Sequence, residues 1–144
     1  MTIYTIGYGG KNAEDFFQTL TDAGVKTLLD VRLYNTSQLA GFTKRDDLKF
    51  FLKTLCQCEY RHLKELAPAP GLLDGYKKQL ITWAQYETEY NRYLSTLTFN
   101  HFLSKRDLAS GCFLCAEPTP EQCHRRLIVE YIQAHMTDVS IVHL

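Results

Sequence analysis

Short apolar runs alternate along this chain with segments whose apolar residues repeat at helical spacing. Residues 2–8 form a run of apolar, β-branched and aromatic residues that ends at Gly9-Gly10, which predicts a strand followed by a turn. In the next segment Asn12 stands in a capping position before apolar residues spaced i, i+3, i+4 and i+7, which predicts an amphipathic helix. The continuous apolar run of residues 25–31 predicts a second strand with both faces buried.

The same alternation continues to the end of the chain. Thr43 is expected to cap a second helix, and a short third strand is expected near residues 59–63. The prolines and glycines between Lys64 and Gly75 predict a mobile surface loop. Downstream, the pattern predicts a helix from Thr82 with an aromatic stripe, a helical piece over residues 100–108, a buried strand over 111–116, a helix starting at Thr119-Pro120, and a last strand over 139–144.

This order of elements predicts an α/β fold with a mostly parallel sheet of about five strands, right-handed crossovers and helices on both faces, in a Rossmann-like, three-layer arrangement. A length of 144 residues suits one domain over residues 1–144. The apolar fraction of 45% and the charged fraction of 22% are ordinary for a globular chain and exclude a disordered or fibrous one. The chain has no internal repeat and no low-complexity segment.

The charge balance limits the kinds of partner that the chain can attract. Sixteen Lys and Arg residues balance sixteen Asp and Glu residues, so there is no global field to hold a nucleic acid, and such binding would need a local basic patch. No apolar run approaches the roughly 18–20 residues that span a bilayer, and the first residues lack signal-peptide features. We therefore expect a cytoplasmic protein without membrane contact. The sequence implies no cofactor and leaves the oligomeric state open.

The cysteines are an odd number in a chain without a secretion signal, which favours free thiols over a disulfide framework. They are Cys56, Cys58, Cys112, Cys115 and Cys123. With His62 and His124, several of them are competent zinc ligands. Structural zinc usually takes closely spaced pairs such as C-x2-C, and the C-x7-C-H arrangement that ends at His124 does not fit that pattern. No metal site is therefore expected.

Polar residues follow the predicted strands at their carboxyl ends, where open parallel sheets bind ligands. They are Gly7, Tyr8, Asp30, Arg32, His62, Cys115 and Glu117, and they are joined by Cys123, His124 and Arg125 in the first turns of the next helix. The free N–H groups and dipole of that helix favour an anion. The same positive end would favour a thiolate at Cys115 or Cys123, and His124 could instead act as a base.

Packing explains several of these residues equally well. Cys112, Cys115 and Cys123 have the character of core thiols, because cysteine is among the most frequently buried residue types. His124 could serve only to bond a loop carbonyl, and Gly7 could serve only a tight turn. The whole set could also form a self-satisfied polar network that holds loops together.

Motifs in the same order from end to end resemble the domain-of-unknown-function family 488. They are Ile3-Tyr-Thr-Ile-Gly-Tyr-Gly9, Asp30-Val-Arg32, Ser37-Gln-Leu-Ala-Gly-Phe-Thr-Lys44, His62-Leu-Lys-Glu-Leu66, Cys115-Ala-Glu117 with Cys123-His-Arg125, and Val142-His-Leu144. The resemblance implies a small α/β domain, mostly bacterial or archaeal, without an accepted reaction. Its motif positions coincide with the strand-end residues named above.

Two classes of function remain open. The first is an enzyme or ligand-processing protein that binds an anionic, phosphate-bearing small molecule, such as a nucleotide, at the carboxyl ends of the strands. Its reaction would be a thiol- or acid/base-assisted transfer or hydrolysis, with catalytic candidates Cys115, Glu117, Cys123 and His124 and ligand-binding candidates Gly7, Tyr8, Asp30, Arg32, His62 and Arg125. The alternative is a non-catalytic nucleic-acid- or protein-binding module that uses the Lys44-Arg45 region and the aromatic helix.

Overall fold

The computed structural model describes residues 1–144 and contains a five-stranded, all-parallel sheet with the order β3-β2-β4-β1-β5. The strands are β1 (Thr2–Gly7), β2 (Thr27–Asp30), β3 (Glu59–His62), β4 (Gly111–Cys115) and β5 (Ser140–His143). In this register Gly7 pairs with Cys115 and Asp30 pairs with Leu114. The carboxyl ends of β1, β2 and β4 therefore lie side by side at one edge, and the predicted mostly parallel α/β sheet is confirmed.

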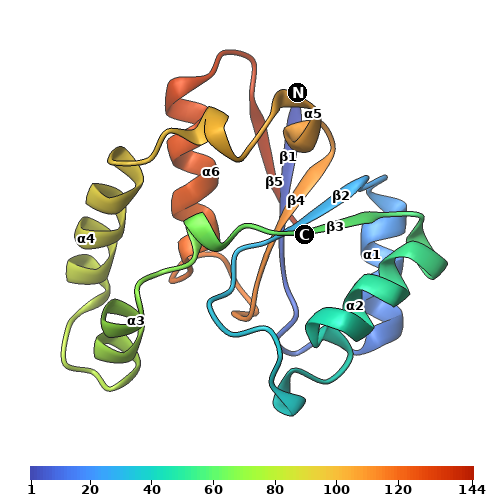
Figure 1. The fold of residues 1–144 in the computed structure, drawn as a ribbon, viewed down its shortest axis with the longest axis horizontal. Coiled ribbons are helices and arrows are strands. Elements are labelled where there is room, and N and C mark those ends of the chain that lie inside the picture. Colours follow the sequence, from blue (N-terminus) through green and yellow to red (C-terminus); the bar gives the residue numbers. More distant parts are fainter.

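Helices cover both faces of the sheet because successive strand residues point to opposite sides (Figure 1). One face packs against α1 (Ala13–Asp22), α2 (Arg45–Phe51) and a π-helical segment, Leu52–Cys56, around Leu28 and Leu114. The other face packs against α4 (Trp83–Ser95), α5 (Lys105–Leu108) and α6 (His124–His135), around Leu29 and Phe113. A shorter helix, α3 (Pro70–Lys77), packs beside one end of α4 (Figure 1). Short 3-10 turns occupy Gln38–Thr43, Lys64–Leu66 and Phe99–His101.

Two predicted helix starts are confirmed by their capping contacts. The side chain of Asn12 accepts the N–H of Asp15 at 2.8 Å and begins α1. Thr82 and Gln85 form a reciprocal capping box at the start of α4. The predicted aromatic stripe of α4 is also present, because Tyr86 and Tyr90 are buried against the core.

Two predicted helix starts are wrong. Thr43 does not cap α2, since its hydroxyl and carbonyl oxygens accept hydrogen bonds from Arg32, and α2 begins at Arg45 instead. The last long helix does not begin at Thr119-Pro120. The carbonyl of Pro120 accepts the N–H of Cys123 in a turn, so that α6 begins at His124 with Cys123 as its cap residue.

The segment from Lys64 to Gly75 is more regular than predicted. Pro70 opens α3 at a first-turn position, where the missing N–H breaks no helical hydrogen bond. The prolines and glycines that suggested a loop are thus compatible with a short helix. Farther on, the helical piece expected over residues 100–108 is interrupted, because Ser104 and Asp107 form a capping box that starts α5 at Lys105.

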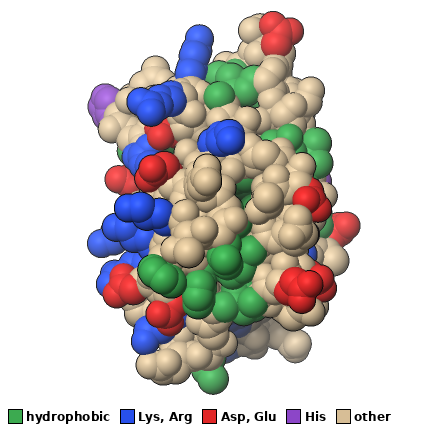
Figure 2. Space-filling view, turned by 90° about the vertical axis from the view of Figure 1, so that its right-hand side faces the viewer, with side chains coloured by type: hydrophobic (Ala, Val, Ile, Leu, Met, Phe, Trp, Pro, Cys, Tyr) green, Lys and Arg blue, Asp and Glu red, His purple; other side chains and the backbone are tan.

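The face of the molecule covered by α1 and α2 carries charges of both signs. Figure 2 shows basic side chains mainly at its left and top, acidic ones toward both edges, and several exposed hydrophobic groups between them. Phe50 and Leu55 are the large exposed hydrophobic residues of α2 and the segment after it. None of the helices is both long enough and apolar enough to cross a membrane.

Candidate functional site

A cavity of about 240 Å³ opens at the carboxyl ends of β1, β2 and β4. Its floor and one wall come from the loops that follow these strands and from the start of α6, and its other wall comes from α3 and α4. Hydrophobic residues make up 12 of its 19 lining residues. The aromatic ones are Tyr8, Tyr34, Tyr76, Trp83 and Tyr86. A largely apolar hollow with a few polar groups is typical of small-molecule sites.

The sequence-predicted residues divide into two groups around this cavity. Those that line it are Tyr8, Arg32, Cys115, Glu117, Cys123 and His124, whereas Gly7, Asp30, His62 and Arg125 do not. Sequence reasoning missed the wall formed by α3 and α4. The aromatic stripe of α4 is visible in the sequence, but its spacing does not show that Trp83 and Tyr86 line a cavity, and the prolines and glycines of α3 predicted a loop.

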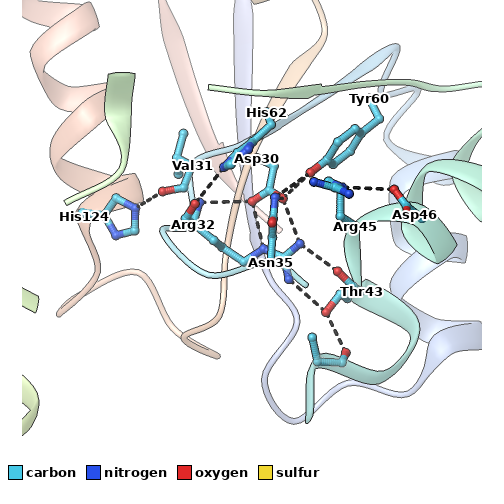
Figure 3. A network of polar contacts seen from close by, with 11 residues as sticks. Asp30, Val31, Arg32, Asn35, Thr43, Arg45, Asp46, Tyr60, His62 and His124 are labelled. Atoms are coloured by element: carbon cyan, nitrogen blue, oxygen red, sulfur yellow. Dashed lines mark hydrogen bonds and ion pairs between the residues drawn. The ribbon is translucent and has the colours of Figure 1, made fainter. Parts of the chain in front are cut away.

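Arg32 is held by Asp30 in a buried network (Figure 3). Its Nε and Nη2 donate to the two carboxylate oxygens of Asp30 at 2.9 and 2.8 Å. Tyr60 and Asn35 also donate to Asp30, at 2.6 and 3.3 Å. Burial opposes ionisation of Asp30, but the hydrogen bonds and charge of Arg32 outweigh burial and hold the pKa of Asp30 below its usual value. Part of the predicted set is therefore a self-satisfied network.

Two histidines bond to carbonyls of the loop that follows β2. His62 Nε2 lies 3.0 Å from the carbonyl oxygen of Arg32, and His124 Nε2 lies 2.7 Å from that of Val31 (Figure 3). Burial lowers the pKa of His124 to about 4, so its imidazole is neutral at pH 7. The neutral ring therefore donates from Nε2 to Val31, and its Nδ1 makes no hydrogen bond within the chain.

Arg125 lies beneath the cavity and holds its floor in place. Its guanidinium is fully buried, and Nη1 donates to the carbonyl oxygen of Glu117 at 2.8 Å and to Cys115 Sγ at 3.1 Å. Burial lowers the pKa of Arg125 from its usual value. A Cβ atom at Gly7 would overlap the same Glu117 carbonyl and would lie 2.9 Å from Arg125 Nη1. Gly7 is therefore needed where the loop after β4 crosses β1.

Cys115 and Cys123 are joined by a disulfide at the cavity wall. The expectation of free thiols is wrong for this pair, because the end of β4 and the residue before α6 meet in space although seven residues lie between them in the sequence. It is confirmed for Cys56, Cys58 and Cys112. Burial raises the pKa of Cys58 to about 12 and that of Cys112 well above its usual value, so neither forms a thiolate at pH 7.

Several polar groups of the cavity have no partner in the chain. Tyr86 is only 2% exposed and lines the cavity. Its hydroxyl makes no hydrogen bond within the chain and keeps some accessible surface. The backbone N–H groups of Ala116 and His124 also lack acceptors, and the carboxylate of Glu117 forms no ion pair. The hydroxyl and the two N–H groups can donate hydrogen bonds to a ligand, and Glu117 can exchange a proton with it.

Comparisons with known proteins place the chain in a family. A search of the curated proteins and a search of the solved structures each find no match. One family model matches residues 12–132, a range that holds the cavity residues from β2, α3, α4, β4 and α6 but not Tyr8. The chain belongs to the family described as domain of unknown function DUF488.

Proposed function

We propose that the chain is a ligand-processing protein whose cavity binds a small molecule carrying a planar ring and an anionic group, such as a nucleotide. The single observation that carries this proposal is the pairing, within one cavity, of an aromatic wall from α3 and α4 with unpartnered hydrogen-bond donors from the β4–α6 loop. The wall suits a flat ring, and the donors suit an anion.

The aromatic wall is an ordered stack. Trp83 and Tyr86 stack with ring centroids 5.0 Å apart, and Tyr76 packs against Trp83 with centroids 5.5 Å apart. The Tyr76 hydroxyl donates to Gln122 Oε1 at 2.8 Å, which ties α3 to the loop before α6. A planar ligand would extend this stack, and the free hydroxyl of Tyr86 would bond to a ring substituent.

The anionic group would be held by the β4–α6 loop. The free N–H groups of Ala116 and His124 are available donors, and the positive end of the helix dipole of α6 lies beside them. Lys77 contributes an unpaired charge from α3. Arg32 contributes less net charge than its position implies, because Asp30 neutralises it.

Proton transfer would fall to Glu117. Its carboxylate is exposed at the cavity and unpaired, whereas the imidazole of His124 is already bonded to Val31. Arg125 and Gly7 act as positioning residues in this proposal, since they fix the backbone of Glu117 without reaching the ligand.

Calorimetric titration with a nucleoside monophosphate, the matching nucleoside and inorganic phosphate tests the proposal. We expect the nucleotide to bind more tightly than either part alone, and Trp83→Ala to weaken its binding at least about tenfold through the lost stacking surface. Tyr86→Phe should weaken it less, and Tyr131→Phe, on α6 outside the cavity, should leave it unchanged. Unchanged affinity in Trp83→Ala, or no binding of any probe, would overturn the proposal. Binding of oligonucleotides alone, with steep salt dependence, would favour the alternative module.

A further inference from the structure

Cys115, Cys123 and His124 bring three metal-ligating atoms together at the wall of the cavity. The two sulfurs and a ring nitrogen of His124 all lie within 4.8 Å of one another. All three residues line the cavity and are more than nine-tenths buried. Their backbone positions are fixed by the end of β4 and by the first residues of α6.

We propose that the reduced Cys115 and Cys123 thiolates, together with His124, bind a divalent zinc-type ion whose fourth coordination position faces the cavity. Two thiolates and one imidazole form a known catalytic ligand set for zinc, in which water or substrate takes the remaining position. The proposal concerns the ion alone and stands independently of the organic ligand proposed above.

The backbone spacing of the two cysteines suits a shared ion. Their Cα atoms are 7.5 Å apart, which is wider than the roughly 4.4–6.8 Å usual for disulfides. In a zinc site each sulfur lies about 2.3 Å from the metal, so the two sulfurs separate and the wider backbone spacing is accommodated. The ligands come from a strand end and a helix start instead of a C-x2-C turn, which explains why the sequence spacing gave no zinc signal.

The surroundings of these residues match what a metal site requires. The bond from His124 Nε2 to the Val31 carbonyl fixes the ring and leaves Nδ1 as the nitrogen free to ligate. Arg125 Nη1 already donates to Cys115 Sγ at 3.1 Å, and the same contact would stabilise a metal-bound thiolate. Cys112 lies on the opposite face of β4 and does not belong to the group.

Loading the ion from the disulfide form requires reduction. A small dithiol reductant transfers two electrons and two protons to the Cys115–Cys123 bond, which opens to two thiols, while the reductant closes to its own disulfide. The incoming divalent ion then displaces both thiol protons into solvent, and the neutral imidazole binds without releasing one. In the reverse direction, a small-molecule disulfide would take two electrons from the thiolate pair and be reduced to two thiols, while the Cys115–Cys123 bond re-forms and the ion is released.

Cobalt(II) titration of the full chain, with no organic ligand present, tests the proposal. Thiol counting in denaturant should give five thiols after reduction and three in the oxidised form. Reduced protein should take up one equivalent of cobalt, with thiolate-to-metal charge-transfer absorption and visible bands of a tetrahedral site, and one equivalent of zinc should remove both signals. Oxidised protein should take up none.

Matched variants show whether these residues supply the ligands. Cys115→Ser and Cys123→Ser should each weaken cobalt binding at least about tenfold and reduce the charge-transfer absorption, and His124→Asn should shift the visible bands. Cys112→Ser and His62→Asn should behave like the wild type. Absence of stoichiometric cobalt binding by fully reduced wild-type chain, or equal loss of binding in Cys112→Ser, would overturn the proposal even if a variant fails to fold.

Discussion

Arg32 turns back at the end of β2 and forms a buried, two-pronged ion pair with Asp30. The side chains are 4% and 0% exposed, and their hydrogen bonds are 2.9 and 2.8 Å long. The guanidinium also donates to the hydroxyl and carbonyl of Thr43 at 3.2 and 2.7 Å. Because residues 33–40 of the loop between Arg32 and Thr43 include several that line the cavity, this pair fixes one cavity wall.

Replacement of Asp30 by Asn should destabilise the fold strongly. The change leaves the buried charge of Arg32 without a counter-charge, and breaking one partner of a buried pair costs about 3–5 kcal/mol. Urea unfolding at pH 7 measures the loss. The control is Glu89→Gln, which breaks the exposed Arg92–Glu89 pair and should cost less than about 1 kcal/mol. Equal small losses in both variants would contradict this role for Asp30.

The same ion pair should make the free energy of unfolding depend on pH. The pKa of Asp30 is lower in the folded chain than the reference value of 3.8, so its ionised form stabilises the fold at every pH above that value. This contribution is lost as the pH falls below about 4 and through the folded-state pKa. The difference in unfolding free energy between wild type and Asp30→Asn should therefore shrink as the pH is lowered from about 5 to about 3. Urea unfolding across this range checks it, and a difference that grows on acidification would contradict the sign.

Much of the fold was predictable because each buried strand is a short apolar run and each covering helix repeats its apolar residues at helical spacing. Asn12 and Thr82 marked helix starts because their capping bonds are local. Thr43 was misread because its oxygens bond to Arg32, eleven residues away, and the sequence pattern carries no sign of that contact. The start of α6 was misread because Thr119-Pro120 satisfies the local capping rules. In the structure the Cys123 N–H instead donates to the Pro120 carbonyl in a turn, and the helix begins after that turn.

Only the part of the candidate site that lies at the carboxyl ends of the strands was predictable from the sequence. Parallel strands place Tyr8, Arg32 and Cys115 at one edge, which follows from sheet topology alone. The pairing of Asp30 with Arg32 was not predictable, because β2 ends at Asp30 and the chain then turns, which brings the Arg32 side chain back onto the Asp30 carboxylate. The contribution of Trp83 depends on how α4 packs against α3, and residue spacing within α4 does not determine that packing.

Replacing Arg125 by Met should lower the stability of the fold, and its effect should not be limited to ligand binding. The guanidinium is buried, and its loss leaves the Glu117 carbonyl without its donor, where a hydrogen bond involving a charged group contributes roughly 1.5–3 kcal/mol. For a chain of this size each kcal/mol lowers the melting temperature by about 2–4 °C. Calorimetric melting measures the effect, with Arg92→Met as the control, because Arg92 lies on α4 with its side chain 67% exposed. An unchanged melting temperature would show that Arg125 is not needed to hold the loop.

Gly7→Ala should disrupt the junction on which the cavity floor depends. The added methyl group would overlap the Glu117 carbonyl, which is backbone and cannot rotate away, and would press on Arg125 Nη1. Overpacking of this kind costs about 1–3 kcal/mol or more, and it should also move the loop that holds Cys115 and Glu117.

The matched control is Gly71→Ala. Gly71 lies in α3, has no positive φ, and has no neighbouring atom within 4 Å of the place that an alanine methyl group would occupy. Alanine there should therefore be neutral or stabilising by up to about 1 kcal/mol. Urea unfolding of both variants, with the cobalt titration repeated on Gly7→Ala, separates loss of stability from loss of site geometry. If Gly7→Ala were as stable as Gly71→Ala, the loop after β4 would not be anchored on β1 as the structure has it.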